Sequence, residues 1–111
     1  MVDEALSRMS LTEISEALVK REVSSQEVVR NSLEELEKRG PSLNCVARLF
    51  PEQALAEAES ADQEFSSGNV RGPLHGVPLL HKDMFYRTGK ISACGSKICE
   101  DYVPDATATV L

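Results

Sequence analysis

The hydrophobic positions in the first third of the chain recur every three or four residues, which is the period of an α-helix. Ser10 and Glu13 stand three positions apart at the start of the first such run, the spacing of a capping box that begins a helix. We therefore expect a helix over residues 11–21. The same spacing recurs from Ser24 onward and predicts a second helix, which should end at the glycine and proline of residues 40–41.

Two further patterns follow in the middle of the chain. Residues 43–50 alternate largely with a period of two, which predicts a short strand that enters the core. Pro51 then suits the first turn of a helix, and the alanine-rich stripe after it predicts a third helix up to Phe65. The small and polar residues at 66–69 end this helix.

The character of the sequence changes at residues 72–78, where four of seven residues are Gly or Pro. Such a segment excludes a helix and forces a turn-rich approach to the apolar pair Leu79 and Leu80. We expect a buried strand here. It would deliver Lys82 and Asp83 at its carboxyl end, where α/β proteins commonly place functional groups.

The residues that follow predict loops with short helical pieces. Residues 88–95 should form a loop and residues 96–100 a helical turn. Pro104 and Asp105 then cap the start of a further helix, of which the chain contains less than two turns. Because an isolated helix that short is marginal in water, we expect the chain to be the amino-terminal part of a longer protein.

Composition and charge argue against several classes of function. The 111 residues carry 12 Lys and Arg against 18 Asp and Glu, a formal charge of -6, so we expect no direct binding of nucleic acid. No apolar run reaches the length of a signal-peptide centre or a membrane span, which predicts a cytoplasmic location without membrane contact. Three cysteines, an odd number, favour reduced thiols over a disulfide framework.

Lys82 is the residue whose setting favours a catalytic role. Most lysines are surface residues paired with carboxylates, and that interpretation applies to Lys82 as well. The tight backbone and two leucines before it, however, would place its stem in a dry environment, and burial lowers the pKa of a lysine because the ammonium loses hydration. A neutral amine is a general base. It needs a hydroxyl nucleophile within reach and amide donors for the resulting oxyanion.

Three phrases of the sequence together resemble the start of the amidase signature family. They are Gly-Val-Pro-Leu-Leu-His-Lys-Asp at residues 76–83, Cys-Gly-Ser-Lys-Ile at residues 94–98 and Pro-Asp-Ala-Thr-Ala-Thr-Val at residues 104–110. The same family's amino-terminal region is similar to residues 11–14, to residues 24–25 with the helix that follows them, to residues 43–44 and to the alanine-rich helix, so the resemblance covers nearly the whole chain. Within the family, the sequence is similar to bacterial amidases and to the A subunit of the glutamyl-tRNA amidotransferase.

The resemblance implies an α/β fold with a large mixed sheet and chemistry on carboxylic amides. Family enzymes act through a Ser-cis-Ser-Lys triad without a cofactor, and Lys82 matches the catalytic lysine, which takes the nucleophile's proton through the bridging serine. No residue here matches either serine, because both lie further downstream in the family, so the 111-residue chain alone is expected to be inactive. Met84 stands where Asn is usual, a difference in the pocket lining that leaves the lysine assignment intact.

Two other constellations fit less well. Ser96 beside Lys97 suggests a Ser-Lys dyad, but neighbours in sequence rarely point at one another, and the resemblance makes this stretch a structural turn. Two histidines and two cysteines could be drawn as a zinc site, yet their spacings fit the usual ones badly, so no metal is proposed. These four residues are His75, His81, Cys94 and Cys99. On the expected strand, His81 should point to the face opposite Lys82.

The sequence therefore predicts the amino-terminal portion of a single amidase-signature domain, truncated at its carboxyl end. It would comprise a helical region at residues 10–68 and the start of the catalytic α/β core at residues 72–111. The expected partners are a small-molecule amide substrate and the missing carboxyl-terminal part of the same chain, and a homodimer stays open. Two rivals also stay open: an amidotransferase subunit, which would need partner subunits, and a small non-catalytic helical interaction module.

Overall fold

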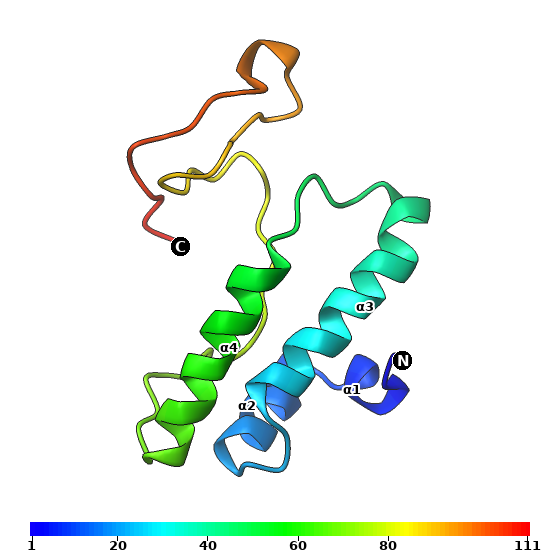
Figure 1. The fold of residues 1–111 in the computed structure, drawn as a ribbon, viewed down its shortest axis with the longest axis vertical. Helices are drawn as coiled ribbons and strands as arrows, with labels where there is room; N and C mark the ends of the chain where they lie inside the picture. Colours follow the sequence, from blue (N-terminus) through cyan, green and yellow to red (C-terminus); the bar gives the residue numbers. More distant parts are fainter. The chain divides into compact units, whose positions relative to one another are not determined.

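Four α-helices and one 3-10 turn are the regular elements of the computed structural model, which describes residues 1–111. They are α1 (Glu4–Arg8), α2 (Leu11–Val19), α3 (Ser25–Leu43), α4 (Pro51–Ser66) and η1 (Lys97–Cys99) (Figure 1). The chain divides into two compact units, which we term the helical unit, Met1–Pro78, and the loop unit, Leu79–Leu111. No helix combines the length and the apolar character that crossing a membrane requires.

Both predicted capping boxes are confirmed, and they begin α2 and α3. At α3, the Ser24 hydroxyl accepts the backbone N–H of Glu27 at 3.1 Å, and the Glu27 carboxylate accepts the Ser24 N–H at 2.8 Å. Ser10 and Glu13 make the same exchange at α2. Each carboxylate accepts two hydrogen bonds, of which the one from the serine backbone amide has the larger effect and the one from the serine hydroxyl the smaller. Because both bonds favour the ionised form, the pKa values of Glu13 and Glu27 lie below the ordinary glutamate value.

The core of the helical unit is formed by apolar side chains of α2, α3 and α4. Its buried centre consists of Leu18 from α2, Val28 from α3, and Ala61 and Phe65 from α4. In Figure 1, α3 and α4 lie side by side and run antiparallel. Each helix thereby removes its apolar stripe from water, which is the main source of stability for helices of this length.

The short helix α1 was not predicted, because five residues contain no periodic pattern. Asp3 caps it by accepting the N–H groups of Ala5 and Leu6 at 2.8 and 3.2 Å. Asn31, a buried residue of α3, holds it in place from the side. Its side-chain oxygen accepts the Asp3 N–H at 2.6 Å, and its side-chain nitrogen donates to the Ser7 hydroxyl at 3.0 Å.

The predicted end of the second helix is wrong by two residues. α3 continues through Gly40 and Pro41 to Leu43 and ends at Asn44, whose φ of 49° is left-handed. A proline ring clashes with the amide and the Cβ of the residue before it. Gly40 has no Cβ, so the last turn of α3 tolerates Pro41. The third predicted helix is confirmed, since α4 begins with Pro51 in its first turn.

The predicted α/β fold class is contradicted, because the structure contains no strand and no sheet. Residues 43–50 form the end of α3 and an irregular connection. Leu79 and Leu80, expected in a buried strand, are 64% and 65% exposed. A strand is stable only when neighbouring strands satisfy its backbone N–H and C=O groups, and no segment of these 111 residues forms a ladder with either stretch.

The loop unit is held together by backbone hydrogen bonds between residues 86–92 and residues 102–108. They join Ala108 N to Tyr86 O at 2.8 Å, Gly89 N to Pro104 O at 3.3 Å, and Ser92 N to Tyr102 O at 2.9 Å. Since the partner's number falls as the residue's number rises, the two segments run antiparallel. The bonds are too widely spaced to form a regular ladder. The helical turn predicted at residues 96–100 is confirmed as η1.

The helix predicted to start after Pro104 is wrong, because residues 104–111 contain bends and a turn but no helix. Thr107 instead contacts the opposite segment, where its hydroxyl oxygen accepts the Thr88 backbone N–H at 3.0 Å. A helix of less than two turns is marginal in water, so these cross-links between segments prevail over the capping signal.

Candidate functional site

Lys82 lies at a turn of the loop unit, and its side chain is exposed to solvent. Its carbonyl oxygen accepts the backbone N–H of Phe85 at 3.0 Å, which closes a turn of four residues. The buried strand predicted for this lysine is therefore absent, and so are the apolar walls expected around its stem. His81, which a strand would have turned to the opposite face, is exposed as well.

Asp83, directly after the lysine, is tied to residues 92–94. The backbone N–H of Ala93 donates to its carboxylate Oδ2 at 3.2 Å, and the Ser92 hydroxyl donates to its carbonyl oxygen. Ser92 is only 2% exposed, so its hydroxyl finds a protein partner where water does not reach. The sulfur of Cys94 lies 4.0 Å from the same carbonyl oxygen. The contacts of Asp83 thus hold the turn that carries Lys82 against residues 92–94.

Hydrogen bonds in the loop unit connect the end of the first family-like phrase and residues next to the second and third phrases. The end of the first phrase, at Asp83, bonds to Ala93, which immediately precedes the second phrase. Residues 86–92 then bond to residues 102–108, which contain most of the third phrase. The sequence showed only their order along the chain. The structure shows that the segments between the phrases link Asp83, at the turn that carries Lys82, to residues 102–108.

The glycine-rich segment at residues 72–78 is pinned to the helices of its own unit. The Ser25 hydroxyl donates to the carbonyl oxygen of Gly76 at 2.6 Å. Gly76 has a φ of 76°, and a Cβ at this position would lie 2.9 Å from the Phe65 ring. Only glycine fits both the left-handed backbone and the close contact with Phe65. Packing against the helices therefore explains why position 76 of this segment is a glycine.

His75 packs inside the helical unit. Its ring stacks on Phe65 with the ring centroids 4.5 Å apart. Nδ1 accepts the backbone N–H of Arg71 at 3.1 Å, which assigns the proton of the neutral ring to Nε2. Nε2 lies 3.3 Å from the Glu64 carboxylate, which also pairs with Arg71 at 2.8 Å. Both ring nitrogens therefore face protein groups.

Asp62 of α4 has a structural role that the sequence analysis did not identify. Its two carboxylate oxygens accept the backbone N–H groups of Ser25 and Gln26 at 2.6 and 3.1 Å. These are the first two residues of α3, whose amides have no partner within the helix, and the helix dipole favours a negative charge there. The sequence did contain one indication of this role. Asp62 is a charged residue next to the apolar stripe of Ala58, Ala61 and Phe65, which faces the other helices.

The competing constellations do not assemble into sites. The Ser96 hydroxyl oxygen accepts the Ile98 N–H at 3.3 Å, so Ser96 caps η1 and does not form a dyad with Lys97. No group of three or more His, Cys, Asp or Glu side chains is placed to hold a metal ion.

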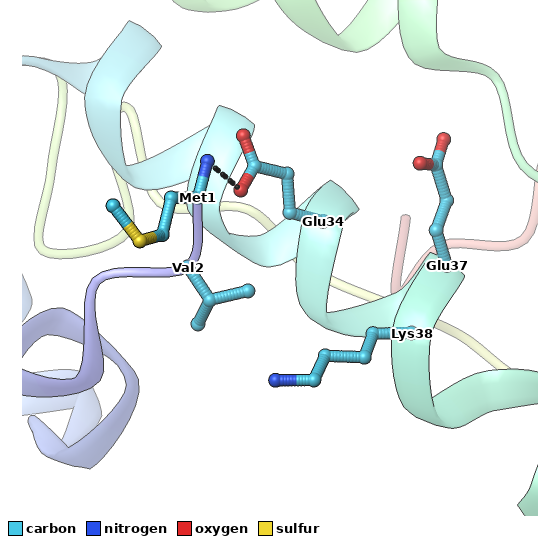
Figure 2. A pocket seen from close by; sticks show the side chains of 5 residues that line it. All are labelled: Met1, Val2, Glu34, Glu37 and Lys38. Atoms are coloured by element: carbon cyan, nitrogen blue, oxygen red, sulfur yellow. Dashed lines mark ion pairs between the residues drawn. The ribbon is translucent and has the colours of Figure 1, made fainter.

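Two shallow hollows on the surface are lined by residues other than Lys82. One on the helical unit is lined by Met1, Val2, Glu34, Glu37 and Lys38. Figure 2 shows the amino terminus of Met1 paired there with Glu34, at 2.9 Å. Another, on the loop unit, is lined by Met84, Phe85, Tyr86, Ala106, Thr107 and Ala108. Both are open to solvent, whereas a small-molecule site usually encloses most of its ligand.

Comparison with known proteins shows what the chain is similar to. The family model described as "Amidase" matches residues 27–111. The chain is 37% identical over 109 residues to "Putative amidase AmiD" of Mycobacterium tuberculosis (strain ATCC 25618 / H37Rv), an alignment that covers 98% of this chain and 23% of that protein. It is 41% identical over 102 residues to the A subunit of the glutamyl-tRNA(Gln) amidotransferase of Alkalilimnicola ehrlichii, covering 92% of this chain and 21% of that relative. The chain thus spans about a fifth of the length of these curated relatives, and the predicted family resemblance is confirmed.

Proposed function

This chain belongs to the amidase family, and we propose that it supplies the lysine base of an enzyme that hydrolyses the C–N bond of carboxylic amides. The observation that carries the proposal is the family match over residues 27–111, a range that includes Lys82 within the phrase at residues 76–83. The role of Lys82 itself rests on the resemblance of that phrase to the one that contains the family's catalytic lysine.

In the proposed reaction, a serine hydroxyl attacks the carbonyl carbon of the amide while its proton passes through a bridging serine to Nζ of Lys82. The C–N bond breaks as the lysine returns this proton, by the same route, to the leaving nitrogen. The product is an acyl-serine ester. Water hydrolyses it, with Lys82 again accepting and returning a proton, and backbone N–H groups stabilise the oxyanion of each tetrahedral intermediate. No cofactor takes part.

We further propose that both serines come from a segment of the enzyme outside residues 1–111, together with the walls that enclose Lys82. Two observations support this. Lys82 is exposed in the loop unit, and the chain spans only about a fifth of the length of its relatives. On this proposal, residues 1–111 are the amino-terminal portion of one amidase domain and hydrolyse no amide by themselves.

The test replaces Lys82 in the enzyme that contains these residues and measures turnover of a simple aromatic amide. Lys82→Ala should lower kcat by about 10²- to 10⁴-fold, because the nucleophile loses its base. Lys82→Arg should be nearly as damaging, since a guanidinium stays protonated and accepts no proton. Lys97→Ala changes another exposed lysine of the loop unit and serves as the control. Turnover of Lys82→Ala within about tenfold of the parent would contradict the assignment.

A second candidate is the glutaminase-type subunit of a tRNA-dependent amidotransferase, which releases ammonia from an amide for a second substrate. The observation that favours it is the 41% identity to the relative from Alkalilimnicola ehrlichii, comparable to the 37% identity to the AmiD protein. Purification of the tagged enzyme from its own cells separates the two functions. An amidotransferase subunit should copurify with partner subunits and use glutamine as its amide, whereas a free-standing amidase should act without partners.

A further inference from the structure

We propose that Asp83 is the positioning residue for Lys82, acting through its contacts with Ser92 and Ala93. The inference rests on the proposed function of Lys82 and deepens it by naming the groups that hold the base in place. Asp83 itself has no part in the proton transfer. Its role is to fix the backbone from which the Lys82 side chain extends.

The contacts converge on Asp83 from consecutive residues of one segment. Its carboxylate accepts the Ala93 N–H at 3.2 Å, and its carbonyl oxygen accepts the Ser92 hydroxyl and lies 4.0 Å from the Cys94 sulfur. A side-chain contact and a main-chain contact at the same residue restrict both its position and its rotation. An attachment by the side chain alone would leave the backbone free to turn.

The contacts of Asp83 with Ser92 and Ala93, which we term the anchor, are themselves held by the rest of the loop unit. Ser92 is 2% exposed, and its backbone N–H donates to the carbonyl oxygen of Tyr102 at 2.9 Å. The same serine therefore links Asp83 to the segment at residues 102–108. On the other side, the Lys82 carbonyl oxygen accepts the Phe85 N–H at 3.0 Å, which closes the turn. The backbone at Lys82 is constrained, while its side chain is exposed and able to reach a partner.

Fixing this backbone matters because proton transfer requires the amine within hydrogen-bond reach of the group it serves. A displacement of about 1 Å can lower the rate about a hundredfold even when no reacting group is removed. Asparagine at position 83 keeps an oxygen that accepts the Ala93 N–H, whereas alanine removes it. A positioning role therefore predicts that Asp83→Asn is tolerated and Asp83→Ala is not. A role for the negative charge predicts that the two variants are equally damaging.

The anchor is tested first in the 111-residue chain, by the amide proton of Ala93 in nuclear magnetic resonance and hydrogen exchange. Asp83→Ala should shift this resonance and speed its exchange, and Asp83→Asn should preserve both. Asp101→Ala, at an exposed acidic position of the loop unit, controls for the loss of a carboxylate and should leave Ala93 unchanged. Ser92→Ala is a second variant in case Asp83→Ala unfolds the unit, since it removes only the contact to the carbonyl. An Ala93 amide unaffected by either alanine would overturn the proposal.

The link to catalysis is tested in the enzyme that contains these residues. Asp83→Ala should lower kcat about a hundredfold with little change in KM, and Asp83→Asn should retain kcat within about threefold. Combined with Lys82→Ala, Asp83→Ala should cost nothing further, because there is no base left to position. An additive double variant, or Asp83→Asn as inactive as Asp83→Ala, overturns the positioning role. An active Lys82→Ala enzyme overturns the proposed function instead, so the two failures are distinguishable.

Discussion

The helical unit and the loop unit differ in how each holds its structure. In the helical unit, a buried cluster of apolar side chains joins three helices, and side chains cap the helix ends. In the loop unit, the 3-10 turn η1 is the one regular element, and single hydrogen bonds between antiparallel segments connect the rest. Helices satisfy their backbone groups locally, whereas extended segments depend on neighbours. The comparison suggests that stability is concentrated in one unit and the candidate catalytic lysine in the other.

Charge and exposed apolar surface separate the two units further. The helical unit contains eight Lys and Arg against fourteen Asp and Glu, while the loop unit contains four of each, so the whole net charge of -6 belongs to the helical unit. Of the seventeen exposed large hydrophobic residues, ten lie in the loop unit, although it has only 33 of the 111 residues. Large exposed apolar patches commonly mark surfaces that other protein segments cover. This distribution fits the proposal that further walls enclose Lys82.

The largest expected effect compares one leucine from each unit. Leu18 is 1% exposed and belongs to the core cluster, so Leu18→Ala should lower the free energy of unfolding by about 2 to 5 kcal/mol. Leu80 is 65% exposed, and Leu80→Ala should change the free energy of unfolding by less than about 0.5 kcal/mol. Urea unfolding followed by helical circular dichroism measures both. Equal costs would mean that Leu80 is buried in solution and that the contrast between the units is wrong.

The next effect concerns the segment that the helices hold. Gly76→Ala should cost about 1 to 3 kcal/mol, because the new Cβ would meet the Phe65 ring and Ser25 and would occupy a left-handed backbone. Gly72→Ala is the matched control, since no atom lies within 4 Å of a Cβ at that position. The same unfolding assay applies. A Gly76→Ala chain as stable as Gly72→Ala would show that the segment is not pinned to the helices.

A smaller effect is expected at the carboxylate that joins α4 to α3. Asp62→Ala leaves the Ser25 and Gln26 amides without their acceptor and should cost about 0.5 to 2 kcal/mol, the range of a lost helix cap. Glu59→Ala, an exposed acidic position on the same helix, controls for the change in charge and helix propensity. If both substitutions had the same small effect, the contact between Asp62 and the start of α3 would contribute nothing to stability.

The sequence predicted those features whose causes are local. Capping boxes at Ser10 and Ser24 and the proline at the start of α4 each depend on a few neighbouring residues, so the helices after them were found. The strand expected at Leu79 and Leu80 was wrong because strand formation depends on partners elsewhere, which a run of apolar residues does not reveal. Local capping signals also failed after Pro104, where contacts between segments prevail.

The candidate site shows the same limit. The resemblance named Lys82, but the hydrogen bonds that hold Asp83 come from Ser92 and Ala93, about ten positions further along the chain. No periodic pattern or motif links these positions. The assignment of Lys82 as the catalytic base stays a prediction until the enzyme assay is made.

The smallest expected effect is a pH dependence that belongs to the helical unit. Hydrogen bonds from the Ser24 amide and hydroxyl hold the pKa of Glu27 below its ordinary value of 4.5. A carboxyl whose pKa is lower in the folded state contributes stability above the unfolded value, and this contribution is lost as pH falls through the folded value. Glu27→Gln keeps an acceptor for the capping box and removes the titration. Near neutral pH, the parent should therefore be more stable than Glu27→Gln by a constant amount. Below about pH 4.5, this advantage of the parent should become smaller as Glu27 is protonated. Urea unfolding from pH 7 to pH 3 measures it, and a difference that stays constant over this range would show that the capping box at α3 does not bind the ionised carboxylate in solution.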